Sequence, residues 1–332
     1  MELIEIDGVD AAQFARFHAL RDDVRRHDQE FPVGLGLTEC QVLFARQDAD
    51  LRVEGLAVVD GDTWLGMAWL DWWLQENTHI VEVEIAVHPA HRRRGAGTFL
   101  LKAATARAKA AGRTVLSTTI LGDYETGDSA GTAFAAARGF SRKHTEYHQV
   151  FELPMAAERL DELEARIAGQ HDEYRLVQWR EHTPDEWIEQ FADALSVMGE
   201  EVPMGELDRE PMRWTPERIR QAEERRLEQG RFCHTTAAIA PDGTLAAYTQ
   251  MGGAAGNPER LYQWDTLVRP EHRGRRLGMG VKIPNLRSLQ AELDHPAVLH
   301  TWNAVENGPM IAVNKYLGFR PVAQRTNWQQ TL

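Results

Sequence analysis

The feature that most constrains this chain is a short segment that occurs twice, about one domain length apart. Residues 87–92 read VHPAHR and residues 268–273 read VRPEHR, and the two segments align without a gap. The register continues to Gly97 in the first copy and to Gly278 in the second. The chain has 332 residues, and domains usually hold about 100–200. A repeat at this spacing therefore predicts two copies of one fold.

Each copy is predicted to begin with a strand, because its side chains alternate between two faces. In the first copy one face carries Val81, Val83, Ile85 and Val87, and the other carries Glu82, Glu84 and Ala86. In the repeat register Glu84 falls on Asp265 and Glu82 on Gln263. The inward face of the second strand is then expected to comprise Tyr262, Trp264, Thr266 and Val268.

A basic turn and a helix follow the strand. Pro89 ends the strand, and Gly95 and Gly97 leave backbone N–H groups accessible at the positive end of the helix. This arrangement predicts an anion-binding site. A P-loop is excluded because Thr98-Phe99 follows the last glycine, and a dinucleotide fingerprint is excluded because Leu100 stands where its third glycine would be.

The order strand, Arg-x-x-Gly-x-Gly, helix resembles motif A of the GCN5-related N-acetyltransferase (GNAT) superfamily, with Arg92, Gly95 and Gly97 at the diagnostic positions. The repeat makes the chain similar in layout to two-domain actinobacterial acetyltransferases, the group that includes mycothiol synthase. The resemblance implies an α/β (α+β) protein of two tandem GNAT folds, each a mixed, mostly antiparallel sheet flanked by helices.

The expected domains are an N-terminal GNAT domain over residues 1–155, a connector over 156–172 and a C-terminal GNAT domain over 173–332. Within the first domain, helices are predicted at about residues 11–27 and 38–47, and residues 143–153 are predicted to form its last strand.

The co-substrate implied by the resemblance is acetyl-CoA, whose pyrophosphate needs N–H donors and a cationic edge. In the first copy these are expected from Val87, Arg92, Arg93, Arg94, Gly95, Ala96, Gly97 and Thr98. In the second copy they are expected from Val268, Arg273, Gly274, Arg275, Arg276, Leu277 and Gly278. Asn303 and Asn307 are further candidates at the junction before the last helix, although helix capping explains Asn307 equally well.

The reaction implied by the resemblance is direct transfer of acetyl to an amine without an acyl-enzyme. A protonated amine cannot attack a carbonyl, so a carboxylate is needed as general base. Glu84 and Asp265 are the candidates in the two copies, with Glu82 in reserve; a solvated strand face is the competing interpretation.

The general acid is where the chain departs from the family. GNAT enzymes often carry a tyrosine on the last helix, but Asn314 and Ala135 occupy that position in the two copies. Tyr316, two positions further on, and Tyr124 are the remaining candidates, and the role is left vacant if neither serves.

The composition limits the classes of partner and ligand that the protein is expected to bind. A net charge of −13 argues against nucleic acid and mildly favours a cationic acceptor. No apolar run approaches the ~20 residues needed to span a bilayer, and the first residues are acidic, so a cytoplasmic protein without membrane association is expected. Cys40 and Cys233 form no ligand cluster, so no metal is expected.

The function that these features predict is N-acetyl transfer from acetyl-CoA to a small amine. A catalytically weak acyl-CoA sensor or scaffold, and transfer of longer acyl groups, remain as alternatives. The acceptor and the oligomeric state are left open, because acceptor pockets are built from loops and early helices without a transferable code.

Overall fold

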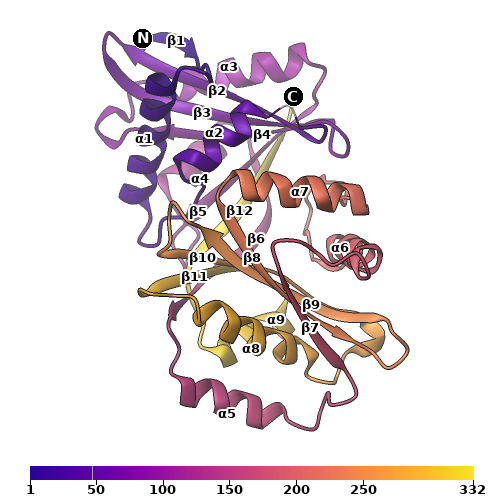
Figure 1. Cartoon of the computed structure of the whole chain (residues 1–332). Helices are drawn as coiled ribbons and strands as arrows, with labels where there is room; N and C mark the ends of the chain where they lie inside the picture. Colours follow the sequence, from indigo (N-terminus) through magenta and orange to yellow (C-terminus); the bar gives the residue numbers. More distant parts are fainter. Residues whose placement is uncertain (47) are drawn as a thin grey trace. The chain divides into compact units, whose positions relative to one another are not determined.

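The computed structural model describes residues 1–46 and 48–332, and these residues form twelve strands, nine α-helices and two short 3-10 helices (Figure 1). The first half contains β1 (Glu2–Glu5), α1 (Ala11–Asp28), α2 (Leu37–Ala45), β2 (Leu51–Asp60), β3 (Thr63–Trp73), β4 (Ile80–Val87), η1 (Pro89–His91), α3 (Ala96–Ala110), β5 (Val115–Gly122), α4 (Ala130–Ala137) and β6 (Ser141–Leu153). The second half contains α5 (Ala157–Ile167), β7 (Arg175–Arg180), α6 (Ile188–Glu201), α7 (Pro216–Glu228), β8 (Arg231–Ile239), β9 (Leu245–Ala254), β10 (Arg260–Val268), η2 (Pro270–His272), α8 (Leu277–Gln290), β11 (Ala297–Ala304), α9 (Gly308–Leu317) and β12 (Arg320–Thr331).

The two early helices agree with the sequence prediction within one or two residues at the ends that can be compared. Gln47, the expected last residue of the second helix, lies outside the described residues. Among the described helices, none is long and apolar enough to cross a membrane.

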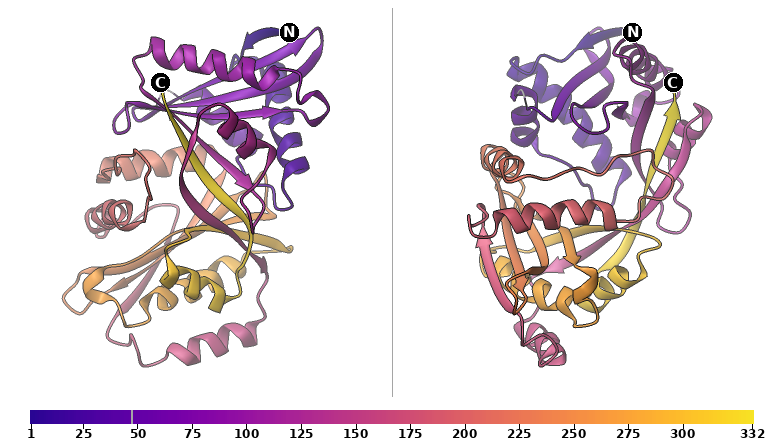
Figure 2. Two further views of the ribbon diagram at one scale, coloured as in Figure 1. Left: turned by 180° about the vertical axis from the view of Figure 1, so that it is seen from behind. Right: turned by 90° about the vertical axis from the view of Figure 1, so that its right-hand side faces the viewer.

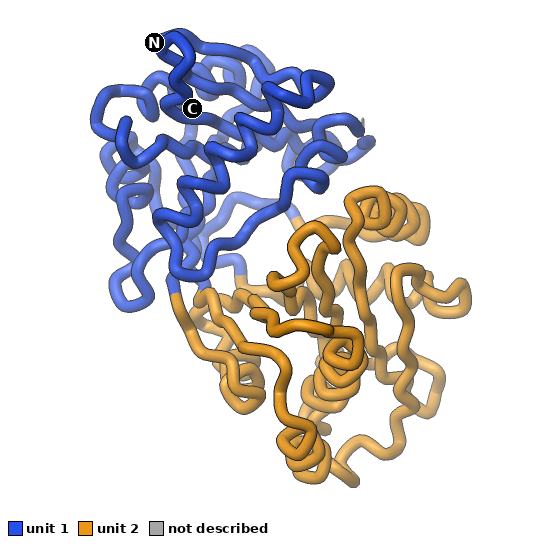
Figure 3. Tube along the Cα trace, turned by 60° about the vertical axis from the view of Figure 1, so that its left-hand side comes forward, with its two compact units in different colours: residues 1–146, 204–210, 323–332 blue, residues 147–203, 211–322 orange. Residues whose placement is uncertain are grey.

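The chain divides into two compact units that exchange their last strands (Figure 3). Unit 1 comprises residues 1–146, 204–210 and 323–332, and unit 2 comprises residues 147–203 and 211–322. The C-terminal strand β12 thus belongs mostly to unit 1, where Gln324–Thr331 pairs antiparallel with Val115–Gly122 of β5. The end of β6 belongs to unit 2. These units differ from the boundaries at 155 and 172 expected from the sequence.

Buried side chains account for this exchange. Trp328 of β12 lies in the apolar core beneath α3 of unit 1. Leu153 of β6, with the half-buried Phe151 beside it, packs in the core beneath α8 of unit 2. Each last strand therefore places its apolar side chains in the unit that it completes, and burial of such side chains is the main source of folding free energy.

Unit 1 is a sheet with helices on both faces. Its strands are ordered β1-β2-β3-β4-β5-β12. Phe14 and Phe17 of α1 pack with Met67 of β3 on one face, whereas Leu100 of α3 packs with Ala68 on the other. Neighbouring residues of β3 thus serve opposite cores, as the two-residue period of a strand requires.

Unit 2 repeats this architecture with strands ordered β6-β11-β10-β9-β8-β7 (Figures 1 and 2). Phe191 of α6 packs with Ala237 of β8 on one face, whereas Val281 of α8 packs with Ala238 on the other. Helices α6 and α7 therefore cover the face equivalent to that covered by α1 and α2, and α8 covers the face equivalent to that covered by α3.

The motif strands of the two units differ by one residue. In unit 1, β4 pairs with β3 in continuous register from Val81 to Val87. In unit 2, Gln263 pairs with Met251 but Thr266 pairs with Thr249, so two residues of β10 stand opposite one residue of β9. This is a β-bulge, which re-aims the side chains at the extra position.

Because of the bulge, the alternation expected for the second strand is wrong. Trp264 lies beneath Arg226 of α7, 5.8 Å from ring centroid to guanidinium, whereas the hydroxyl of Thr266 bonds that of Thr249 at 2.8 Å in the interior. Tyr262 stacks on Trp264, so these two rings lie on the α7 side and not with Thr266 and Val268.

Candidate functional site

The two helices that the repeat places after the basic turns lack side-chain caps at their N-termini, a feature that they share with α2, α5 and α6. Helices α3 and α8 have no side-chain hydrogen bond at their first turn. By contrast, α1, α4, α7 and α9 are capped by Asp10, Ser129, Thr215 and Asn307. The first N–H groups of a helix have no intrahelical partner, and they carry its positive dipole end. Both units therefore present an anion-binding helix start.

The turn before each helix uses a left-handed residue. Gly95 has φ +93°, and Arg276, at the equivalent position, has φ +56°. Glycine adopts this conformation freely, whereas an arginine there costs about 1–2 kcal/mol. A Cβ on Gly274, which also has positive φ, would meet no atom within 4 Å, so the second turn remains open.

The two arginines that begin the motif hold the turns together. Nε of Arg92 donates to the carbonyl oxygen of Val87 at 3.1 Å, and Nη2 pairs with Asp28 at 2.6 Å. Arg273 repeats both contacts, with the carbonyl of Val268 at 3.2 Å and with a carboxylate of α6, Glu201, at 2.6 Å. These side chains, expected to contact the cofactor, are thus already bonded within their own units.

The other expected cofactor residues have mixed surroundings. Arg275 donates to the carbonyl of Glu271 at 3.1 Å, and the hydroxyl of Thr98 accepts from Arg138 at 2.8 Å. Arg93, Arg94 and Arg276 are exposed. Ala96 and Leu277 are buried at the first helical position, Gly97 and Gly278 follow them, and Asn307 caps α9 through the N–H of Met310.

The candidate base of unit 1 is locked in an ion pair. Oε2 of Glu84 accepts from Arg21 at 2.6 Å and from Arg25 at 2.9 Å, and Arg21 also lies over the ring of Trp69 at 4.3 Å. Although burial alone would raise the pKa of Glu84, the two guanidinium groups lower it to about 2. A carboxylate this weakly basic is a poor proton acceptor at neutral pH.

A different carboxyl of unit 1 titrates near neutrality. Asp71 stands opposite Glu82 in the β3–β4 pair, and its Oδ1 accepts from Nε1 of Trp69 at 2.7 Å. Burial, with the charge of Glu82 adding to it, raises the pKa of Asp71 to about 7. The sequence analysis missed Asp71 because its strand shows no motif.

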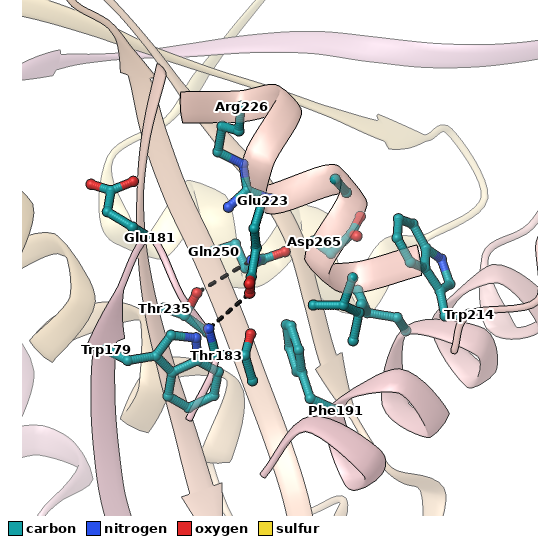
Figure 4. Close-up of a pocket in the computed structure, with 13 residues that line it drawn as sticks. Trp179, Glu181, Thr183, Phe191, Trp214, Glu223, Arg226, Thr235, Gln250 and Asp265 are labelled. Carbon is teal, nitrogen blue, oxygen red and sulfur yellow. Dashed lines mark hydrogen bonds between the residues drawn. The ribbon is translucent and has the colours of Figure 1, made fainter. Parts of the chain in front are cut away.

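The candidate base of unit 2 lines a pocket. The cavity has a volume of about 80 Å³ and lies on the face of the sheet covered by α6 and α7 (Figure 4). Its lining combines acidic and aromatic side chains, among them Asp265, Glu181, Glu223, Trp179, Phe191 and Trp214. Burial raises the pKa of Asp265 to about 6, so this carboxylate is basic enough to take a proton yet ionised at pH 7.

The bulge in β10 is held by the side chain of Gln263. Its Nε2 donates to the carbonyl oxygens of Gln250 at 3.0 Å and Trp264 at 3.1 Å. The extra residue lets both Trp264 and Asp265 face α6 and α7. The second copy therefore presents its carboxylate without the paired arginines that neutralise Glu84 in the first.

Two further carboxylates line the pocket. Glu223 is fully bonded, accepting from the N–H of Thr183 at 2.8 Å and from Nη1 of Arg220 at 2.7 Å. Glu181 has φ +54°, and its buried Oε2 has no hydrogen-bond partner among the described residues. The one arginine that lines the pocket in the described structure is Arg226.

Both tyrosines considered as general acids are exposed. Tyr316 is 38% exposed and its hydroxyl accepts from Arg166 of α5 at 3.1 Å, whereas Asn314, two positions earlier, is fully buried. Residues two apart on a helix point about 200° apart, which accounts for the difference. Tyr124 is exposed in the turn after β5.

Several contacts could not be found from sequence motifs. Arg21 and Arg25 are one helical turn apart on α1, which is a weak signal for a shared partner and gives no indication of which carboxylate they bind. The pocket residues come from β7, α6, α7 and three further strands, so only the folded chain brings them together.

Comparisons with known proteins agree with this architecture. Residues 21–140 match the Acetyltransferase (GNAT) family. No curated protein matches the chain in sequence.

Solved structures extend the match to the whole chain. A tandem GNAT protein from the clavulanic acid biosynthesis pathway, determined without acetyl-CoA, is 27% identical, with a TM-score of 0.81 over 99% of this chain and 98% of that one. A GCN5-related N-acetyltransferase from Sphaerobacter thermophilus shares the fold at 13% identity, with a TM-score of 0.67 over 99% of this chain and 95% of that one. The whole chain therefore has a tandem GNAT fold, and its residues 21–140 are similar in sequence to the Acetyltransferase (GNAT) family.

Proposed function

We propose that this protein is an acetyl-CoA-dependent N-acetyltransferase that transfers acetyl directly to a small amine, and that unit 2 carries the reaction. The observation on which this rests is the contrast between two equivalent carboxylates. Asp265 lines a pocket with a pKa raised to about 6, whereas Glu84 is ion-paired with a pKa lowered to about 2. Asp265 is therefore the better general base.

The pocket suits a cationic acceptor. Three carboxyl side chains line it against one guanidinium, and aromatic rings can contact an ammonium group through their faces. A small amine is protonated at neutral pH and enters as a cation, which Asp265 then converts to the nucleophilic free base. The acidic lining thus serves both to attract the acceptor and to prepare it for attack.

Residues at the start of α8 are suited to hold the CoA pyrophosphate. The backbone N–H groups of Leu277 and Gly278 begin an uncapped helix, and the exposed side chain of Arg276 adds a guanidinium at its entrance. Bound acetyl-CoA would supply the thioester carbonyl that the amine attacks. Strand β10 pairs with β11 only from Arg260 to Tyr262, so the two strands separate just before the bulge and Asp265.

The geometry of unit 1 supports the alternative function that the sequence left open, that of a catalytically weak acyl-CoA sensor or scaffold. Its Gly95 turn supports CoA binding, but Glu84 is not available as a base because Arg21 and Arg25 hold it. We therefore assign unit 1 a CoA-binding role without turnover, and assign both units a CoA site.

The test is thiol release from acetyl-CoA across a panel of small amines. Asp265→Asn is expected to lower kcat/KM by about 10²-fold or more at pH 7, the usual contribution of a general base. Glu84→Gln and Asp71→Asn, the matched changes in unit 1, are expected to keep the wild-type rate. Loss of activity in either unit 1 variant with Asp265→Asn still active would move the reaction to unit 1, and no release by the wild type with tight CoA binding would favour a sensor.

A further inference from the structure

Unit 2 contains a fully buried lysine, Lys282, at a position that is apolar in unit 1. Lys282 lies on α8 and is 1% exposed. Its Nζ donates to Oδ1 of Asn314 on α9 at 2.8 Å, and this is the one hydrogen bond that the described residues provide for its three donor positions. None of those residues offers it a carboxylate. A buried ammonium without a counter-ion is costly, so burial favours the neutral amine of Lys282 over its charged form.

The residues bonded to Lys282 extend toward the region where β10 and β11 are no longer paired, which we call the strand gap. Nδ2 of Asn314 donates to Oδ1 of Asn303 at 2.6 Å, and Nε2 of Gln149 donates to the same oxygen at 3.0 Å. Asn303 lies near the end of β11, beyond the last residue paired with β10. The network therefore contains only amides and one amine, and it ends where the two strands have separated.

The first copy shows that the fold does not require these polar groups. In the repeat register Leu101 is equivalent to Lys282, and counting back from the Gly-Phe pairs at 139–140 and 318–319 makes Ala135 equivalent to Asn314. Both residues of unit 1 are buried in an apolar core. The same helix pair is thus packed by a leucine and an alanine in one unit and by a lysine and an asparagine in the other, so the polar pair has a purpose other than packing.

Resting on the function proposed above, we propose that Lys282 is the proton donor to the departing thiolate of CoA, held in place by Asn314. Asp265 faces α6 and α7, whereas Lys282 projects from α8 on the opposite face of the sheet, and the proposal places the thioester between β10 and β11, beyond their last paired residues. A thioester in that gap would have the amine and its base on one side and its sulfur toward the other. Asn314 also occupies the position at which the sequence analysis expected a tyrosine acid.

The step balances in atoms and charge. The amine nitrogen forms a bond to the acetyl carbon, and the carbon–sulfur bond breaks with its electron pair on sulfur. A proton passes from Nζ of Lys282 to sulfur, and the neutral lysine regains a proton from water. The ammonium group of the substrate loses two protons, both through Asp265. Over the whole reaction, sulfur gains one proton and the solvent receives the other.

The surroundings of Lys282 suit this role. Burial lowers its pKa to about 7, and no ionised group among the described residues contributes to that shift. A donor with a pKa near neutrality is half protonated at pH 7 and can protonate a thiolate whose conjugate acid titrates near 8.5. Other titratable groups contact α8 away from Lys282: His171 lies against Gly280, and His234 bonds Ser288. Asp161 and Glu164 pair with Arg287 of the same helix, and Lys315 of α9 is exposed.

The first test measures contact with sulfur without any turnover. CoA and desulfo-CoA, which lacks the thiol, are titrated calorimetrically at pH 8 into wild type, Lys282→Met, Lys282→Gln and Leu101→Met. Wild type and Leu101→Met are expected to prefer CoA by about five- to tenfold, because the thiol forms a hydrogen bond with the amine of Lys282. Both Lys282 variants are expected to lose this preference. An equal loss of affinity for the two ligands would place Lys282 near the phosphates and overturn the proposal.

The second test measures the reaction. Lys282→Met and Lys282→Gln are expected to lower kcat by about 10²-fold with little change in KM, and to abolish the fall in rate above pH 7 while keeping the rise near pH 6. Thermal unfolding checks that each variant folds, and Lys282→Gln can still donate a hydrogen bond to Asn314. A wild type that prefers CoA over desulfo-CoA but shows no turnover would remove the proposed function and leave the lysine–sulfur contact standing; unchanged kcat in a folded variant would overturn the proton-donor role.

Discussion

Glu84 and Asp265 occupy equivalent strand positions, and their neighbours alone give them opposite chemistry. Two guanidinium groups stabilise the charged form of Glu84, whereas no cation contributes to the pKa of Asp265 and burial stabilises its neutral form. A pKa difference of this size reflects several kcal/mol of differential interaction. The side chains of α1 therefore decide which of the two copies offers a base.

The pH profile should report Asp265. A general base must be ionised, and burial raises the pKa of Asp265 to about 6. We expect kcat/KM to rise with pH through about 6 and to lose about tenfold for each unit below it. Steady-state thiol release between pH 5 and pH 8 measures this directly, and an ascending limb near pH 4, the ordinary range of an aspartate, would contradict the assignment.

Glu84 should matter to stability instead. Its folded pKa of about 2 is below the ordinary value of 4.5, so its contribution is fully present above pH 4.5 and is lost as the pH falls toward 2. We expect Glu84→Gln to lower the free energy of unfolding by about 3 kcal/mol at pH 7, because Arg21 and Arg25 lose their counter-ion.

Urea titrations at pH 7 and pH 3 measure this effect. The difference between wild type and Glu84→Gln should shrink at pH 3, where the glutamate begins to be protonated. An equal difference at both values would mean that packing and not charge causes the loss.

The sequence was sufficient to locate these two carboxylates, but not to predict their protonation states. Alternation places Glu84 on the outer face of a strand, and the repeat then finds Asp265. Their pKa values depend on arginines about sixty positions away in the first copy and on a pocket drawn from six elements in the second. Such contacts are set by tertiary packing, for which no local pattern exists in a single chain.

At the scale of elements, the strand–turn–helix unit was predictable and its irregularities were not. The bulge in β10 inserts one residue relative to β9, but the sequences of the two copies still align without a gap. The gapless alignment therefore gave no sign that Trp264 and Asp265 both face the same side of the sheet. Likewise, Arg276 adopts a left-handed conformation between the 3-10 turn and α8, which its residue type alone would argue against.

The turn before α8 permits a separation of backbone and side-chain effects. Arg276→Gly and Arg276→Ala both remove the guanidinium, but only glycine relieves the positive φ. We expect both variants to weaken CoA binding in unit 2 by about tenfold, as for loss of a charge-assisted hydrogen bond. We expect Arg276→Gly alone to raise the melting temperature.

Calorimetry and thermal unfolding measure the two quantities on the same samples. If glycine tightened CoA binding, the Cβ at this position would be obstructing the phosphate, and the side chain would have no binding role. Gly95→Arg in unit 1 is the converse change and should leave thiol release unaffected.

At the scale of the whole molecule, the exchange of last strands makes each unit dependent on the other half of the chain. A fragment of residues 1–155 lacks β12, so β5 loses its antiparallel partner and the core loses Trp328. We expect this fragment to aggregate or to show no cooperative unfolding, because an uncovered edge strand and an incomplete core are both destabilising.

A peptide of residues 317–332 provides the matched test. Added to the fragment during refolding, it should restore near-ultraviolet circular dichroism and a cooperative urea transition, whereas a scrambled peptide should not. A fragment that folds without the peptide would show that β6 can serve as its own last strand.

The exchange also bears on how such a protein can change over generations. Two copies that arise by duplication are ordinarily free to diverge until one is deleted. Here a deletion of either copy would remove a strand from the survivor, so purifying selection must preserve both for folding even where only one performs chemistry. The first copy can thus accept Arg21 and Arg25 beside Glu84 and still be inherited intact, so a new ligand specificity could arise there without loss of the copy.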